Sequence, residues 1–154
     1  MKISIIGTGY VGTVLGAGLA ELGHDVTLVD IDSRKIEKIN SKEAPIYEKG
    51  LQELIKKNAP MRLKATTSLR DAIFSTELTF ICVGTPSRKE GNMDLAQVKA
   101  VCSEIGTALK NKQQKHFIVI KSTVLPGTSE ECIKLIEEAS LKKFPLHFSL
   151  AMNP

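Results

Sequence analysis

The beginning of the chain places a short apolar run, a glycine-rich turn and an acidic residue in a fixed order. Lys2-Ile3-Ser4-Ile5-Ile6 is rich in β-branched side chains and runs directly into Gly7-Thr8-Gly9-Tyr10-Val11-Gly12. Such runs are typical of strands buried in a parallel sheet. Small and apolar residues follow at helical spacing up to Gly23, and a second apolar run ends at Asp30. This order predicts the strand, turn, helix and strand of a dinucleotide-binding βαβ unit.

Each glycine of the turn has its own physical role in such a unit. Gly7 permits the tight turn, and Gly9 leaves no side chain where a pyrophosphate approaches the backbone. Gly12 lets the helix pack closely on the strand, and the helix N-terminus offers N–H groups and a positive dipole end to phosphates. Glycine turns also join strands to helices for structural reasons alone. Only the complete βαβ context favours nucleotide binding.

Asp30 bears on which dinucleotide binds. It lies about 20 residues beyond the turn, where a carboxylate hydrogen-bonds the adenosine ribose. Its charge repels a 2′-phosphate, which favours NAD over NADP. Arg34 and Lys35 follow closely and are able to hold a phosphate, so the alternative stays open. In a purely structural interpretation, Asp30 only ends the strand while Asp32 or Ser33 caps the next helix, and both interpretations can hold together.

Apolar runs alternate with helical patterns along the rest of the chain. Strands are expected at residues 63–66, 78–83, 117–120 and 146–150. Helices are expected at residues 33–40 and 51–57, and further helices begin near Ser68, Asp94 and Thr128. Such alternation implies a parallel sheet covered on both faces, with right-handed crossovers. The sequence therefore predicts one doubly wound, Rossmann-type α/β domain over residues 1–154.

Two of the helix starts carry capping signals. Ser68 is followed three residues later by Asp71, a pattern that predicts a reciprocal cap. Thr128 opens a run of hydroxyl and acidic residues that predicts the cap of a later helix.

Two threonines follow expected strands at the edge where ligands bind. In doubly wound sheets this edge is the one formed by the carboxyl ends of the strands. Gly84-Thr85-Pro86 follows one strand, and Ser122-Thr123 follows the next. A threonine at a strand end commonly bonds nearby backbone, so a single one indicates little. Two at the rim of one crevice favour a cofactor role for at least one of them.

Composition argues against several other functions. The net charge of +4 is modest, tryptophan is absent, and no basic patch is interleaved with aromatic residues. We therefore expect no nucleic-acid partner. No apolar run reaches the length of a membrane span, and the first residues already belong to a strand. We therefore expect no membrane partner and no signal peptide.

The cysteines and histidines are spaced too far apart to form a site. Cys82, Cys102 and Cys132 show no zinc-type spacing, and their odd number argues against a disulfide framework. We expect them to be reduced in the cytoplasm and to hold no metal. The three histidines are isolated as well: His24, His116 and His147.

Several segments together resemble a known family. They are Gly7 to Gly12, Val29-Asp30, Pro45-Ile46-Tyr47-Glu48, Cys82-Val83-Gly84-Thr85-Pro86 and Lys121-Ser122-Thr123-Val124-Leu125-Pro126-Gly127-Thr128. In this order and spacing they resemble the N-terminal NAD-binding domain of the UDP-glucose/GDP-mannose dehydrogenase family, over essentially the whole chain. The segment from Ser122 is the most specific. Asn153-Pro154 is similar to the start of that family's Asn-Pro-Glu-Phe-Leu motif. Lys49 departs from the family, which often has proline there.

The resemblance implies an enzyme that oxidises C6 of a nucleotide sugar twice, from alcohol to carboxylate, with two NAD. It assigns Tyr10 and Val11 to the phosphate-binding turn. It places Asp30 and Lys35 by the adenosine ribose, and Thr85 and Thr123 along the cofactor cleft. The hydroxyl of Thr123 is also associated with an ordered water near the chemistry.

The same resemblance implies what this chain lacks. The family's catalytic cysteine lies beyond Pro154, and none of the three cysteines matches it. We therefore expect no catalytic residue in this chain. It is expected to be a domain truncated from a larger enzyme, with that enzyme's central helix and substrate domain absent. The fragment alone is expected to be inactive. The full-length protein is expected to be a homodimer that binds the sugar mainly through the missing domain.

The resemblance leaves the substrate open. UDP-glucose is the default, and GDP-mannose and UDP-N-acetylhexosamines are alternatives. Two rival interpretations are a stand-alone NAD-binding module and a β-hydroxyacid or hydroxyacyl dehydrogenase, which lacks the pattern at residues 122–128.

Overall fold

The structure is a computed structural model that describes residues 1–88 and 91–154. Its centre is a six-stranded sheet in the order β3-β2-β1-β4-β5-β6. The strands are β1 (Lys2–Ile6), β2 (Asp25–Val29), β3 (Leu63–Thr66), β4 (Leu78–Ile81), β5 (His116–Ile120) and β6 (Phe148–Met152). Every neighbouring pair is parallel, and the strand order reverses between β1 and β4. This is the predicted doubly wound, Rossmann-type sheet.

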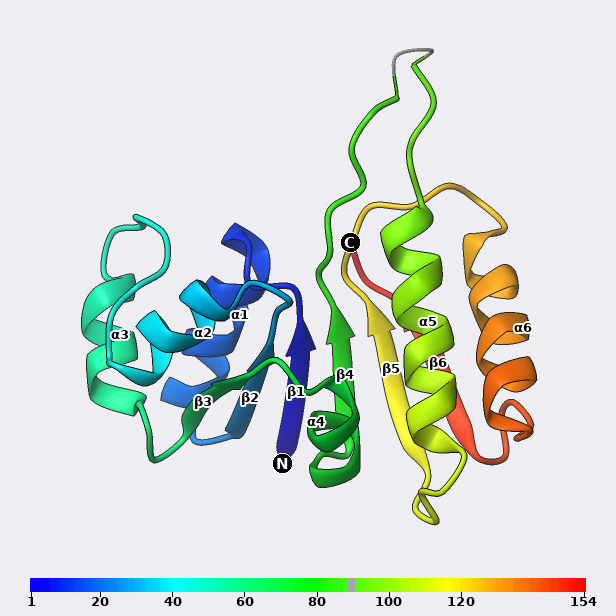
Figure 1. Cartoon of the computed structure of the whole chain (residues 1–154), viewed down its shortest axis with the longest axis horizontal. Helices are drawn as coiled ribbons and strands as arrows, with labels where there is room; N and C mark the ends of the chain where they lie inside the picture. The colour runs from blue at the N-terminus through cyan, green and yellow to red at the C-terminus, as the bar shows by residue number, and fades with distance from the viewer. Residues whose placement is uncertain (89–90) are drawn as a thin grey trace.

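Helices cover both faces of the sheet (Figure 1). They are α1 (Tyr10–Glu21), α2 (Ser33–Asn40), α3 (Leu51–Asn58), α4 (Leu69–Ser75), α5 (Ala96–Leu109) and α6 (Thr128–Ser140). One buried core joins α1, α2 and α3 to the sheet, and a second joins α4, α5 and α6. Successive residues of β1 alternate between them, since Ile5 belongs to the first core and Ile6 to the second.

Two helix ends follow the sequence signals closely. Gly23, at φ +93°, ends α1, and the N–H groups of Gly23 and His24 donate to Ala20 O and Leu19 O. Asp32 caps α2 by accepting from the Arg34 N–H at 3.0 Å.

Two capping predictions were wrong in part. Ser68 caps α4 by accepting from Asp71 N–H, but its own N–H donates to Thr66 Oγ1, so the cap is not reciprocal. Thr128 is the first residue of α6 rather than its cap, and Gly127 occupies the capping position without a side chain.

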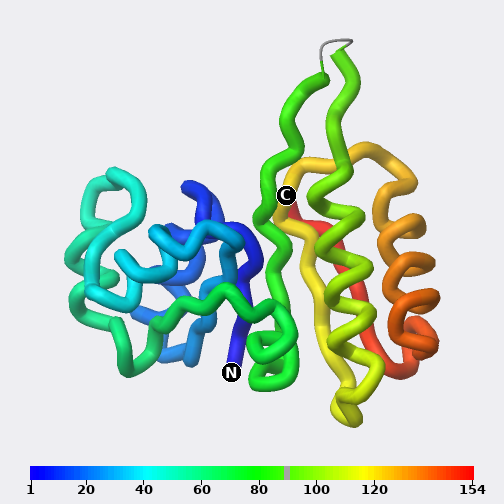
Figure 2. Tube along the Cα trace, in the orientation of Figure 1, coloured from blue at the N-terminus to red at the C-terminus, as the bar shows by residue number. Residues whose placement is uncertain are grey.

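A long connection rises above the carboxyl edge of the sheet between β4 and α5 (Figures 1 and 2). Residues 87–93 are mostly polar in sequence, and Lys89 and Glu90 among them lie outside the described residues. Ser87 and Met93 form an antiparallel bridge. Arg88 pairs with Asp94 at 3.0 Å. The two arms of the connection are therefore tied to each other at residues 87–88 and 93–94.

A buried lysine lies at the opposite, amino edge of the sheet. Lys112 is 3% exposed, in the connection between α5 and β5. Its ammonium donates to Ile73 O at 2.6 Å, to Thr76 O and to His116 Nδ1 at 3.0 Å. These three acceptors match the three N–H groups of an ammonium, which explains how the charge is buried.

His116 continues this network across the sheet, so the prediction of an isolated histidine was wrong. Because Nδ1 accepts from the lysine, Nε2 carries the proton and donates to Thr79 Oγ1 at 2.7 Å. The chain of donors continues from Thr79 to Ser4, from Ser4 to Thr76 and from Thr76 to Ala72 O, at 2.6, 3.0 and 2.7 Å. Each hydroxyl donates once and accepts once, so the network is fully satisfied.

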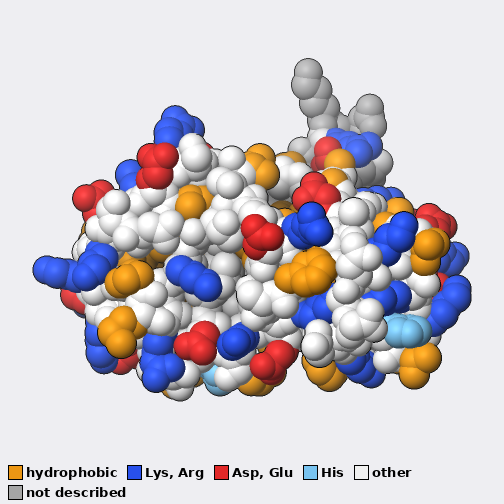
Figure 3. All heavy atoms as spheres, turned by 60° about the horizontal axis from the view of Figure 1, so that its bottom comes forward, with side chains coloured by type: hydrophobic (Ala, Val, Ile, Leu, Met, Phe, Trp, Pro, Cys, Tyr) orange, Lys and Arg blue, Asp and Glu red, His pale blue; other side chains and the backbone are white. Residues whose placement is uncertain are grey.

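Figure 3 turns this edge of the molecule toward the viewer. Basic and acidic side chains are interspersed across the face shown, with apolar side chains scattered between them. Within residues 1–88 and 91–154, no helix combines the length and apolarity that a membrane crossing requires.

Candidate cofactor-binding site

The glycine turn leaves β1 at the carboxyl edge, and its geometry requires glycine at two positions. Gly7 has φ +100°, and a Cβ there would lie 2.8 Å from Cys82 O. A Cβ on Gly12 would overlap the carbonyl oxygen of Gly7. At Gly9, by contrast, a Cβ would meet nothing within 4 Å, so the space beside this residue is open. Gly7 and Gly12 thus shape the turn, and Gly9 leaves room for a group outside it.

Helix α1 begins directly beside this open space. Its N-cap is Gly9, which supplies no side-chain hydrogen bond, and its first turn holds no acidic residue. The positive end of the helix dipole therefore faces the space with no acidic residue in the helix's own first turn to neutralise it. Tyr10 and Val11, in that first turn, are exposed. The arrangement fits the pyrophosphate of a dinucleotide.

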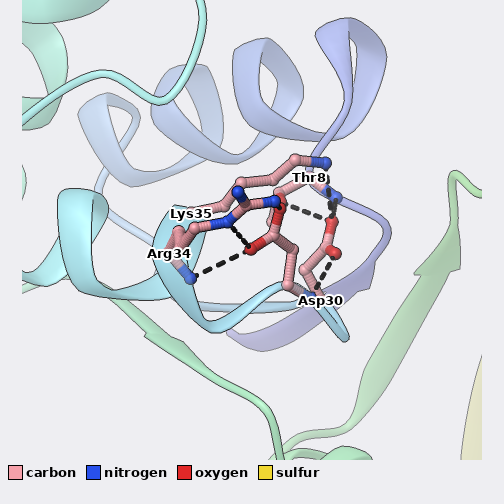
Figure 4. A network of polar contacts seen from close by, with 5 residues as sticks. Thr8, Asp30, Arg34 and Lys35 are labelled. Atoms are coloured by element: carbon pink, nitrogen blue, oxygen red, sulfur yellow. Dashed lines mark hydrogen bonds and ion pairs between the residues drawn. The ribbon is translucent and has the colours of Figure 1, made fainter.

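Asp30 follows β2 and is held by four donors (Figure 4). Its Oδ2 accepts from the Thr8 N–H at 2.8 Å and from the Thr8 hydroxyl at 2.6 Å. Lys35 Nζ lies 3.4 Å from the same oxygen, while Oδ1 accepts from the Asp32 N–H at 3.0 Å. The carboxylate is thereby fixed between the glycine turn and the start of α2.

These contacts decide the protonation state of Asp30. Partial burial raises the pKa of this carboxyl, but the bonds from Thr8 and Asp32 and the charge of Lys35 outweigh it. The pKa of Asp30 therefore lies below its ordinary value, and the group is a carboxylate at neutral pH. A fixed carboxylate is the acceptor that a ribose hydroxyl requires.

The two cations near Asp30 are both engaged with carboxylates. Arg34 forms a two-pronged pair with Asp32, Nε to Oδ1 at 3.0 Å and Nη2 to Oδ2 at 3.1 Å (Figure 4). Lys35 faces Asp30. The sequence left these cations open as ligands for a 2′-phosphate. Their pairing favours an unphosphorylated ribose.

The two predicted threonines also lie at the carboxyl edge. Thr85 follows β4 and is half-buried, whereas Thr123 follows β5 and is exposed. Ser122 joins these two strand ends by donating its hydroxyl to Val83 O at 2.7 Å. All nine predicted cofactor residues thus follow the carboxyl ends of neighbouring parallel strands β2, β1, β4 and β5.

The cysteines take no part in this site as nucleophiles. Burial raises the pKa of the Cys82 thiol to about 12. Cys102 and Cys132 are fully buried between α5 and α6. In the described part of the chain, no three side chains of the metal-ligating types cluster together.

Sequence reasoning missed Thr8 as a contributor to the site. Thr8 occupies the variable position between the first two glycines, where the turn pattern places no demand on the side chain. Its partner is 22 residues away along the chain, so its contact depends on the pairing of β1 with β2.

Comparison with known proteins agrees with this geometry. The model of the UDP-glucose/GDP-mannose dehydrogenase family, NAD binding domain, matches residues 1–154. The GDP-mannose 6-dehydrogenase of Pseudomonas syringae pv. tomato is 48% identical over 100% of this chain and 36% of its own length. The UDP-glucose 6-dehydrogenase of Haloferax volcanii is 46% identical, with the same coverage of 100% and 36%.

A solved structure gives the same result. The GDP-mannose dehydrogenase from Pseudomonas aeruginosa, solved as a ternary complex, superposes with a TM-score of 0.98 at 45% identity, covering 100% of this chain and 36% of that one. The chain thus spans about a third (36%) of the length of the curated relatives it matches. From its glycine turn to its last strand, this chain belongs to the UDP-glucose/GDP-mannose dehydrogenase family, as the NAD-binding domain of that family.

Proposed function

We propose that residues 1–154 form the single cofactor domain of a larger nucleotide-sugar 6-dehydrogenase and bind NAD along the carboxyl edge of the sheet. One observation carries the proposal. The open space beside Gly9 and the fixed carboxylate of Asp30 lie on adjacent strand ends, joined directly through Thr8. A pyrophosphate site next to a ribose acceptor is what the adenosine half of NAD requires.

Each site residue has a role in this proposal. The turn formed by Gly7, Gly9 and Gly12 admits the pyrophosphate, and the N–H groups of Tyr10 and Val11 face it. Asp30 accepts from the adenosine ribose. Lys35, 3.4 Å from Asp30, holds that carboxylate in place and balances its charge. Thr85 and Thr123 line the path toward the nicotinamide end.

The chemistry of the complete enzyme is part of the proposal. Bound NAD accepts a hydride, and two such steps convert the C6 alcohol of a nucleotide sugar to a carboxylate. The residues described here orient the cofactor and supply no nucleophile, since Cys82 is held as a thiol by burial. We therefore propose that the 154-residue chain alone binds NAD without oxidising a sugar.

Two sugar nucleotides are candidates for the complete enzyme. The similarity to GDP-mannose 6-dehydrogenases, at 48% identity in one case, supports GDP-mannose as the first to test. UDP-glucose, the default substrate from the family resemblance, is supported by the relative at 46% identity. The two are distinguished by measuring NADH formation from each sugar nucleotide, with a protein completed to the length of these relatives.

A homodimer and a cytoplasmic location belong to the same proposal. The three free cysteines support the cytoplasmic location.

Isothermal titration of NAD into variants of the chain tests the cofactor site. Asp30→Ala is expected to weaken NAD binding by about tenfold and to narrow the preference over NADP, because a charged acceptor of the ribose is lost. Asp25→Ala is the matched control, since Asp25 begins the same strand that Asp30 follows and lies at the far edge. Equal NAD affinity in the Asp30→Ala variant and the parent chain would contradict the proposal.

A further inference from the structure

Thr8 brings two donors to one oxygen of Asp30. Its N–H and its hydroxyl lie 2.8 and 2.6 Å from Oδ2, and its side chain is completely buried. Both bonds reach a carboxylate, which makes them stronger than bonds between neutral groups. The hydroxyl bond is the shortest of the four contacts to the carboxylate, beside the Thr8 N–H and the Lys35 ammonium on Oδ2 and the Asp32 N–H on Oδ1.

The two oxygens of Asp30 are unequally occupied as a result. Oδ2 has the two donors of Thr8 and the Lys35 ammonium at 3.4 Å. Oδ1 has the Asp32 N–H alone, at 3.0 Å. A carboxylate accepts about four hydrogen bonds over its two oxygens, so the capacity left for a ligand is on Oδ1. The side chain of Asp30 is 11% exposed, which leaves it accessible from the crevice.

We propose that the Thr8 hydroxyl is a positioning residue for the adenosine ribose. By occupying Oδ2 it turns Oδ1 toward the ribose, and it ties this acceptor to the turn that receives the pyrophosphate. The inference rests on the proposed role of Asp30 in binding NAD. Thr8 thereby links the glycine turn to Asp30, the acceptor for the ribose. The preference for NAD over NADP then depends on a side chain that does not itself face the crevice.

Titration calorimetry with NAD and NADP tests this coupling. Thr8→Val keeps the branched shape and the N–H bond but removes the hydroxyl, and it is expected to weaken NAD binding by about five- to tenfold. The preference for NAD over NADP is expected to narrow, since the carboxylate that repels a 2′-phosphate is then held by one donor fewer. Thr8→Ser keeps the hydroxyl and retains the affinity of the parent chain within about twofold.

The chain contains a matched control in α1. Thr13 is also buried, and its hydroxyl has no hydrogen-bond partner within residues 1–88 and 91–154. Thr13→Val removes the same atom and leaves both NAD affinity and cofactor preference unchanged. If Thr8→Val does not fold, as judged by its thermal transition, Thr8→Ser and Thr8→Ala provide the same comparison of a hydroxyl with none.

A double-mutant cycle shows whether Thr8 acts through Asp30. In the Asp30→Ala background, the removal of the Thr8 hydroxyl is expected to have no further effect on NAD affinity. An effect that persists in that background, or a Thr8→Val variant that binds like the parent chain, overturns the inference. If Asp30→Ala itself leaves NAD affinity unchanged, the proposed ribose site fails instead, so the two failures are distinct.

Discussion

At the scale of single residues, the surroundings of His116 disfavour a second proton on its imidazole ring. Its Nδ1 faces the Lys112 ammonium at 3.0 Å, and its Nε2 donates to Thr79. Burial lowers the pKa of His116 to about 3, and the charge of Lys112 contributes to the shift. Burial likewise lowers the pKa of Lys112 to about 8. The network is therefore stable with a neutral imidazole and a charged lysine at neutral pH.

This protonation state predicts acid sensitivity. The ordinary histidine pKa is 6.5, and the folded value is about 3. Below pH 6.5, His116 binds a proton in the unfolded chain but stays neutral in the folded chain. The free energy of unfolding therefore decreases as the pH falls toward 3. The free energy of unfolding then decreases by about 1.4 kcal/mol per pH unit from this group. Urea unfolding measures the free energy of unfolding at pH 7 and at pH 4.5. The decrease between these two values is expected to be about 2–3 kcal/mol smaller in His116→Gln than in the parent chain.

His147→Gln is the control for this measurement, because His147 is exposed and lies outside the network. It is expected to follow the pH dependence of the parent chain. An unchanged acid response in His116→Gln would show that the buried imidazole does not resist protonation.

Residue-scale features differ in how far the sequence predicts them. Asp32 was one of two predicted caps of α2, with Ser33, because capping depends on neighbours two or three positions away. Asp30 was chosen as a candidate ribose acceptor because its distance from the glycine turn is characteristic of the βαβ unit. Thr8 and His116 were missed, since their partners lie on other strands and become neighbours only when the sheet forms.

At the scale of elements, helices α5 and α6 pack tightly against each other at a glycine. A Cβ on Gly106 would lie 2.7 Å from the Cβ of Ala139 and 2.9 Å from Ile136 O. No L side chain fits there without moving one helix. Gly106 therefore sets the distance between these two helices, which lie over the β5 and β6 side of the sheet (Figure 1).

Two glycine-to-alanine variants are expected to have opposite effects on stability. Gly106→Ala overpacks the interface between α5 and α6 and should lower the free energy of unfolding by about 1–3 kcal/mol. Gly18→Ala, in α1, meets nothing within 4 Å. It should raise the free energy of unfolding by about 0.5–1 kcal/mol through helix propensity. Urea unfolding of both variants measures this, and a stabilised Gly106→Ala would contradict the close packing.

Element boundaries were predicted best where local signals define them. Helix α2 (Ser33–Asn40) and strand β3 (Leu63–Thr66) have the predicted bounds, and α3 extends one residue beyond the expected 57. Strand β4 ends at Ile81 rather than 83, and β6 covers Phe148–Met152 rather than residues 146–150. Pairing decides these two ends, since β6 follows the register that joins His116 to Phe148. The sequence around β6 alone does not predict how β6 pairs with β5.

At the scale of the whole molecule, topology determines where the site lies. The strand order reverses between β1 and β4, so the chain leaves these two strands in opposite directions. A crevice forms at that point outside the carboxyl ends of the strands. The turn after β1, Asp30 after β2, Thr85 after β4 and Thr123 after β5 all meet at this edge. The alternation of strands and helices made this arrangement predictable.

The most direct test is an NMR titration of NAD into the chain with assigned backbone amides. The amide signals of residues 7–12, 30–35, 85 and 123 are expected to shift together with one dissociation constant. Those of Asp25, Arg62 and Lys112, at the opposite edge of the sheet, should stay in place. Shifts centred on the amino edge, or none at saturating NAD, would contradict a cofactor site built on the glycine turn and Asp30.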